Sequence, residues 1–269
     1  MIIPIDKSGF LVNNGNKNRI DKKLLAVLDE VLFFCERELA NNIFSIYVRG
    51  SVAAGNFKRN ISDIDFVIVL KRKASFADLE KIKDYSWNMD KKYSWVRGFD
   101  LFLVDKEFLL ASKDLNKLRI YLKTQSILLA GNDILKKIKK YKPNGMLAEE
   151  LLLNINEDIS FISKALSGKE MLYNGQPRSI RFWCVWMSRV ILRYSLYASL
   201  GKHHLYTNDL KDCFNIVTKN YPWTKPYLKT ALVLSQKPIN NKKKLHNFFN
   251  EALSEIKKLM ILNNLYIKI

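Results

Sequence analysis

The chain has 269 residues, of which 48% are hydrophobic and 12% aromatic, a composition typical of a folded globular protein that excludes a largely disordered chain. Lysine and arginine number 45 against 26 acidic residues, so the net charge is +19, and the excess is spread along the chain. This charge favours an anionic partner such as RNA or a nucleoside triphosphate. Solvated lysine-rich faces would give the same total without any such partner.

The sequence shows no pattern for membrane insertion or export. Three arginines, at 181, 189 and 193, interrupt the most apolar region, residues 180–200, and the N-terminus lacks a basic segment followed by an apolar core. Three scattered cysteines and three histidines form no zinc-binding pattern. We therefore expect a cytoplasmic protein with reduced thiols and no membrane partner, and no sequence pattern indicates an oligomeric state.

Residues 1–145 combine helical and strand patterns. Apolar residues at helical spacing predict helices at 20–39, 75–93 and 106–122. Runs rich in β-branched and aromatic residues predict strands at 43–48, 64–70, 99–104 and 126–131. This order of elements predicts a short mixed sheet with flanking helices.

After residue 145 the pattern becomes helical only. Turn signals rich in glycine and proline separate the helices, which are expected at 147–166, 178–200, 208–220, 226–234 and 241–263. No strand is predicted in this part. We therefore predict an α+β chain of two domains, with the sheet in residues 1–145 and an all-α helical bundle in residues 146–269.

A polar motif lies between the first two predicted strands. Gly50-Ser51 follows the first strand, eleven residues intervene, and Asp63-Ile64-Asp65 opens the second strand. Side chains alternate along a strand, so Asp63 and Asp65 project from one face, roughly 6–7 Å apart. Their charges are costly to bury without compensation, which Mg²⁺ with phosphate oxygens would supply. Gly50 lets the backbone approach a phosphate, and the Ser51 hydroxyl adds a donor.

Asp100 lies in the third predicted strand, which continues with apolar residues. If that strand lies beside the second one, three carboxylates meet at one edge of the sheet. Asp63 and Asp65 would then hold Mg²⁺, and Asp100 would deprotonate an acceptor hydroxyl or hold a second ion. Each part of this pattern is common alone, but the combination favours metal-assisted nucleotidyl transfer.

Together, Gly50-Ser51, Asp63-Ile64-Asp65 and Asp100 resemble the signature of the DNA polymerase β-like nucleotidyltransferase superfamily. The layout resembles that of the aminoglycoside 3″/9-type adenylyltransferases, in which a helical bundle follows the catalytic domain. The resemblance implies a polymerase β-like fold and a magnesium-dependent transfer of AMP from ATP to an acceptor hydroxyl, with two Mg²⁺ ions as cofactor and pyrophosphate as product.

The resemblance extends into the helical part. Residues 188–202 are similar to the middle helix of the family's bundle and the turn after it, which places Arg193 where the family has a phosphate-binding arginine. Lys202 would substitute for a phosphate-binding lysine that the family carries slightly later. Two features depart from the family. Its general base is usually glutamate, where this chain has Asp100, and its acidic drug-binding residue has no counterpart at residues 181–183.

The hypotheses about function differ in the molecule that accepts the nucleotide. The overall layout favours a small-molecule hydroxyl, as in the antibiotic adenylyltransferases. The charge of +19 and the absent acidic residue favour an RNA end, such as tRNA in a toxin-like enzyme. A third hypothesis is a non-catalytic antitoxin or nucleotide-binding module of the same fold. The complete set of three carboxylates argues against it, because a binding module does not need all of them.

Overall fold

The computed structural model describes residues 1–168, 172–173 and 176–265. The chain divides into two compact units. The sheet unit is Leu11–Lys140, and the helical unit combines Met1–Phe10 with Tyr141–Ile269. The N-terminal segment is tied to the helical unit by a backbone hydrogen bond from Ile3 to Tyr206 (2.8 Å). The sequence-based division had placed this segment with the sheet.

The sheet unit is built on four strands. They are β1 (Ile43–Arg49), β2 (Ile64–Leu70), β3 (Phe99–Asp105) and β4 (Ser126–Gly131). Their order in the sheet is β3-β2-β1-β4, with β2 and β3 parallel and the other pairs antiparallel. The mixed sheet predicted from the sequence is thereby confirmed, and β3 forms one of its edges.

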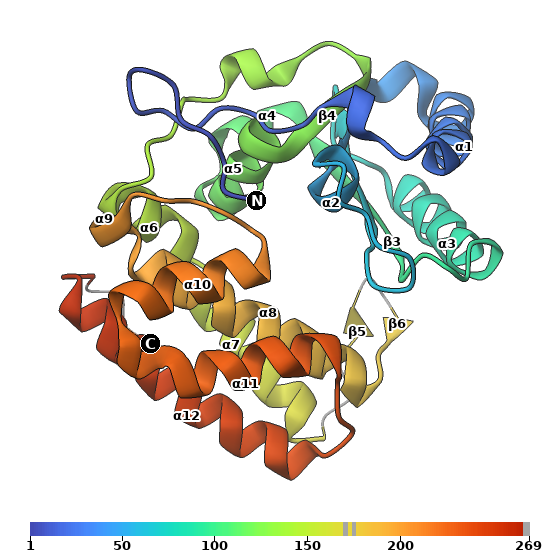
Figure 1. Cartoon of the computed structure of the whole chain (residues 1–269). Helices are drawn as coiled ribbons and strands as arrows, with labels where there is room; N and C mark the ends of the chain where they lie inside the picture. The colour runs from blue at the N-terminus through green and yellow to red at the C-terminus, as the bar shows by residue number, and fades with distance from the viewer. Residues whose placement is uncertain (169–171, 174–175, 266–269) are drawn as a thin grey trace. The chain divides into compact units, whose positions relative to one another are not determined.

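Helices cover both faces of this sheet (Figure 1). They are α1 (Lys22–Leu39), α2 (Gly50–Ala53), α3 (Phe76–Lys92), α4 (Lys106–Ala111) and α5 (Asn116–Gln125). Phe66 and Ile68 of β2 pack into a core with α1 and α3, whereas Val67 and Val69 pack into a second core with α4 and α5. Each face of β2 is therefore apolar, as expected for a strand covered on both sides.

The helix predicted at 106–122 is interrupted. Ser112 has an extended backbone (φ −68°, ψ 129°), which ends α4, and its hydroxyl accepts a hydrogen bond from the N–H of Asp114 (3.2 Å). A serine at such a position satisfies the exposed N–H groups of the next turn and so favours a new start. The apolar periodicity runs across the break, which is why the pattern alone predicted one helix.

The helical unit is arranged around one long helix, α8. Its helices are α6 (Gly145–Leu152), α7 (Ile155–Leu166), α8 (Ile180–Ala198), α9 (Leu200–His203), α10 (Leu210–Asn220), α11 (Lys225–Gln236) and α12 (Lys242–Leu262). Helix α8 packs against α6, α7, α10, α11 and α12 (Figure 1). Within the described residues, no helix is long and apolar enough to cross a membrane.

Short elements complete the two units. The 3₁₀ turns are η1 (Lys17–Arg19), η2 (Ala40–Asn42), η3 (Lys113–Leu115), η4 (Ile134–Lys137) and η5 (Pro222–Thr224). Strands β5 (Leu172–Tyr173) and β6 (Gln176–Pro177) form an antiparallel pair. The prediction that no strand follows residue 145 was therefore wrong, because strands of two residues leave no alternating pattern in the sequence.

Candidate active site

Three charged residues lie in one row across the sheet. Arg49 at the end of β1 is the register partner of Asp65 on β2, and Asp65 is the partner of Asp100 on β3. On its strand, each of them lies on the same face as the side chains that face α4 and α5, at a spacing of two residues from the nearest one. Tyr47 precedes Arg49 in this way, and Val67 follows Asp65. The apolar face that packs under α4 and α5 thus ends in a polar row.

Arg49 contacts both carboxylates of this row. Its Nη2 lies 3.2 Å from Oδ1 of Asp65 and 3.7 Å from Oδ2 of Asp100. The three side chains are between 16% and 23% exposed, so the contacts are only partly screened by water. The guanidinium also lies 5.8 Å from the ring centroid of Tyr121 on α5, within the range of a cation–π interaction.

Asp63 lies just before β2 and is held by a different arginine. Its carboxylate pairs with Arg97, in the loop that leads into β3. Backbone hydrogen bonds join the two loops on either side of this pair, from Arg97 N–H to the Ser62 carbonyl and from Ile64 N–H to the Gly98 carbonyl (both 3.0 Å). These bonds hold the backbone on both sides of Asp63 and so fix its position before β2.

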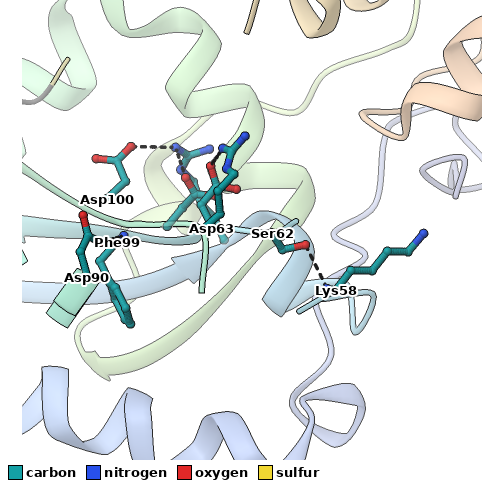
Figure 2. Close-up of polar contacts among 9 residues, drawn as sticks. Lys58, Ser62, Asp63, Asp90, Phe99 and Asp100 are labelled. Carbon is teal, nitrogen blue, oxygen red and sulfur yellow. Dashed lines mark hydrogen bonds and ion pairs between the residues drawn. The ribbon is translucent and has the colours of Figure 1, made fainter. Parts of the chain in front are cut away.

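The backbone ahead of Asp100 is clamped by α3. Asp90 accepts a hydrogen bond from the N–H of Phe99 (2.7 Å), and the Ser86 hydroxyl donates to the carbonyl of the same residue (2.7 Å). Figure 2 shows Asp90 beside Phe99, with Asp100 next along the strand. Both backbone groups of Phe99 are thus held by side chains of one helix, which sets the position of Asp100.

Gly50 and Ser51 form a cradle beside Asp65. Gly50 has a φ of +70°, and a Cβ built on it would lie 2.9 Å from Oδ2 of Asp65. Only glycine accepts both the conformation and the close approach without strain. The Ser51 hydroxyl is buried and has no hydrogen-bond partner among the residues that the structure describes. A buried hydroxyl without a partner is costly, so this atom suits a ligand that supplies one.

Gly50→Ala is expected to weaken nucleotide binding by about tenfold or more, because the new methyl group enters the cradle; a tenfold loss corresponds to about 1.4 kcal/mol. The backbone strain should also lower the melting temperature. Gly9→Ala is the matched control, since Gly9 has a φ of +78° and no atom within 4 Å of a built Cβ. Thermal-shift titration with ATP and Mg²⁺ should show weakened binding in Gly50→Ala alone. Equal binding in both variants would mean that Gly50 does not take part in phosphate binding.

The chemistry of this donor set fits a divalent cation. Asp65 and Asp100 are register partners on neighbouring strands, Asp63 is two residues from Asp65, and carboxylate oxygens are the ligands that Mg²⁺ prefers. The buried Ser51 hydroxyl beside them suits a phosphate oxygen. In this structure arginines pair with the carboxylates, and within residues 1–168, 172–173 and 176–265 no group of three or more metal-ligating side chains is arranged to hold an ion. An ion would have to compete with these arginines.

The two remaining predicted residues lie in the helical unit. Arg193, on α8, donates to the backbone carbonyl of Asn208 (3.5 Å), and Lys202, on α9, is exposed. Burial lowers the pKa of His203 to about 4, so this ring is neutral at pH 7 and supplies no positive charge for a phosphate. Lys202 therefore remains the candidate at this turn, and the phosphate contacts of both residues stay predictions.

The comparisons with known proteins agree with this geometry. Residues 29–143 match the family model described as a nucleotidyltransferase domain. No curated protein matches the chain. Among solved structures, the chain is similar to the spectinomycin adenyltransferase AAD(9) from Enterococcus faecialis, which was solved with ATP and spectinomycin. The TM-score is 0.57 at 13% sequence identity, over 86% of this chain and 98% of the other.

The matched segment contains the strands, the Gly50-Ser51 cradle and all three carboxylates. The structural similarity spans both units and confirms the predicted fold, a sheet domain followed by a helical one. Residues 29–143 of the chain therefore form a nucleotidyltransferase domain.

Proposed function

We propose that this protein transfers AMP from ATP to a hydroxyl group of a small-molecule acceptor, with release of pyrophosphate. The observation that carries the proposal is the pair of facing carboxylates, Asp65 and Asp100, of which Asp65 lies against Gly50, the residue next to the buried hydroxyl of Ser51. This places acidic groups next to a site that suits phosphate oxygens.

The residues divide the reaction between them. The Ser51 hydroxyl donates a hydrogen bond to a phosphate oxygen, and the backbone at Gly50 lets the triphosphate approach Asp65. Asp63 and Asp65 would hold Mg²⁺, which when bound neutralises charge on the triphosphate and on the departing pyrophosphate. Asp100, on the edge strand, accepts the proton of the acceptor hydroxyl. The acceptor oxygen then bonds to the α-phosphorus, and the bond from that phosphorus to the bridging oxygen breaks.

We propose that Arg193 and Lys202 contact the phosphates, because Arg193 falls where the adenylyltransferases that the chain resembles have a phosphate-binding arginine and Lys202 lies shortly before the place of their phosphate-binding lysine. A guanidinium and an ammonium group add positive charge where the triphosphate carries its negative charge.

The acceptor class is supported by the similar spectinomycin adenyltransferase, which was solved with ATP and spectinomycin. A small cyclic molecule with free hydroxyl groups is therefore the preferred acceptor. An RNA end is the second candidate, and the net charge of +19 is the observation that favours it. The match to a nucleotidyltransferase domain supports an enzyme over a non-catalytic binding module.

Incubation with each of the four α-labelled nucleoside triphosphates and Mg²⁺ tests the proposal. Each reaction contains either a panel of aminoglycosides and aminocyclitols or total RNA. We expect label from ATP in a small molecule, with one pyrophosphate released per label. Label in RNA alone would replace the small-molecule acceptor by RNA, and label from another nucleotide would correct the donor. Absence of transfer in every reaction would contradict both candidates.

A further inference from the structure

We propose that Arg49 is a positioning residue that serves as an internal cation for Asp65 and Asp100, so that a divalent cation must displace it to bind. The inference rests on the proposed function in one respect, since it takes Asp65 as a metal ligand. Its consequence is an order of events: the empty enzyme binds the cation weakly, and nucleotide and cation enter together.

The geometry places Arg49 where it can act on both carboxylates at once. Cross-strand register sets it directly opposite Asp65, whose other register partner is Asp100. One guanidinium nitrogen is shared between the two, at 3.2 Å and 3.7 Å. The arginine is thus fixed by the sheet itself and does not reach the site from a flexible loop.

Electrostatics give this position its significance. Neighbouring strands are about 4.8 Å apart, and like charges directly opposite each other on a sheet repel. Asp65 and Asp100 are such a pair and need a positive charge between them. Arg49 supplies that charge in the nucleotide-free protein, and the contact with the Tyr121 ring favours this orientation of the guanidinium.

Arg49 is also the residue directly before the Gly50 cradle. A triphosphate bound at Gly50 and Ser51 would therefore bring negative charge close to the guanidinium, which pairs well with phosphate oxygens. Arg49 can then exchange Asp65 for a phosphate oxygen while the cation binds Asp65. Without a nucleotide, the cation competes with Arg49 and gains no phosphate ligand in return.

Mn²⁺ binding to the nucleotide-free protein tests this, by electron paramagnetic resonance of the free ion or by calorimetry. Removing a nearby positive charge strengthens the attraction of a divalent cation, so we expect Arg49→Gln to bind Mn²⁺ about tenfold more tightly than the wild type. Arg49→Lys retains the charge and should bind as weakly as the wild type. Arg72→Gln is the matched control, because Arg72 is exposed just beyond the opposite end of β2.

Melting temperatures identify the variants that fold. Arg49→Met serves as a second neutral replacement, because its unbranched apolar side chain can still lie near Tyr121. Unchanged Mn²⁺ affinity in the folded neutral variant would overturn the proposal. So would equal tightening in Arg49→Lys, because the charge would then be irrelevant. The measurement involves no acceptor and no turnover. A wild type that transfers no nucleotide would therefore refute the proposed function and leave the result for Arg49 interpretable.

Discussion

Asp65→Asn is expected to reduce kcat/KM for nucleotidyl transfer by about 10³-fold or more, which corresponds to about 4 kcal/mol of transition-state stabilisation. The substitution keeps the shape of the side chain and removes its charge. Asp65 is central to the site, because it faces Asp100, lies beside the Gly50 cradle and pairs with Arg49. An amide there would weaken the hold on Mg²⁺ and leave Arg49 with Asp100 as its only carboxylate in the row.

Single-turnover rates with labelled ATP measure this effect, with the melting temperature as a check on folding. Asp29→Asn is the matched control, because it removes the same charge from an exposed position on α1. The control should keep the wild-type rate. A folded Asp65→Asn enzyme that retains transfer within a few fold of the wild type would show that Asp65 is no metal ligand.

Asp100→Asn is expected to lower kcat by about 10²- to 10⁴-fold, the range that loss of a general base produces. The stabilisation of the protein by ATP with Mg²⁺ should change little, because the phosphate cradle and the other two carboxylates remain. Loss of this stabilisation together with kcat would instead identify Asp100 as a ligand of a second metal ion. The two roles predicted from the sequence are thereby separated by one thermal-shift experiment.

Asp100→Glu provides the conservative comparison. It keeps the carboxylate and lengthens the side chain by one methylene. Glutamate is also the residue that the adenylyltransferases usually carry at this position. We expect transfer well above that of Asp100→Asn. If the two variants are equally inactive while both fold and bind ATP, then the length of the side chain matters as much as its charge, and the clamp on Phe99 by Ser86 and Asp90 is what sets the reach of Asp100.

The fold of the sheet unit was largely predictable from the sequence. The two strands at 64–70 and 126–131 were predicted with the bounds that the structure gives, because each is a compact apolar run. The break between α4 and α5 was not, because it depends on a single hydroxyl at Ser112 that the apolar periodicity ignores. In the helical unit the same periodicity merged α6 with α7.

The site was predictable only in its acidic half. Three carboxylates stand out because such groups are costly in apolar strands, namely those of Asp63, Asp65 and Asp100. The Gly50-Ser51 pair stands out because it lies between a strand and the Asp63-Ile64-Asp65 motif. The two arginines that pair with these carboxylates, Arg49 and Arg97, are not among the residues that the sequence predicts. The sequence indicates only that the Arg49 side chain lies on the same face of β1 as Tyr47. Its pairing with Asp65 and Asp100 becomes evident only from the register of the three strands. Arg97 and Asp90 carry no signal in the sequence, because their partners Asp63 and Phe99 are brought to them by the tertiary fold.

The two-sided core of β2 also protects the catalytic geometry against error. Because side chains alternate, a slip of one residue in the pairing of β2 would turn Asp65 toward the apolar core under α1 and α3 and turn Phe66 toward the polar row. Such a slip would bury a charge and expose an aromatic ring in the same movement. Misregistered chains are therefore selected against during folding, well before any nucleotide is bound.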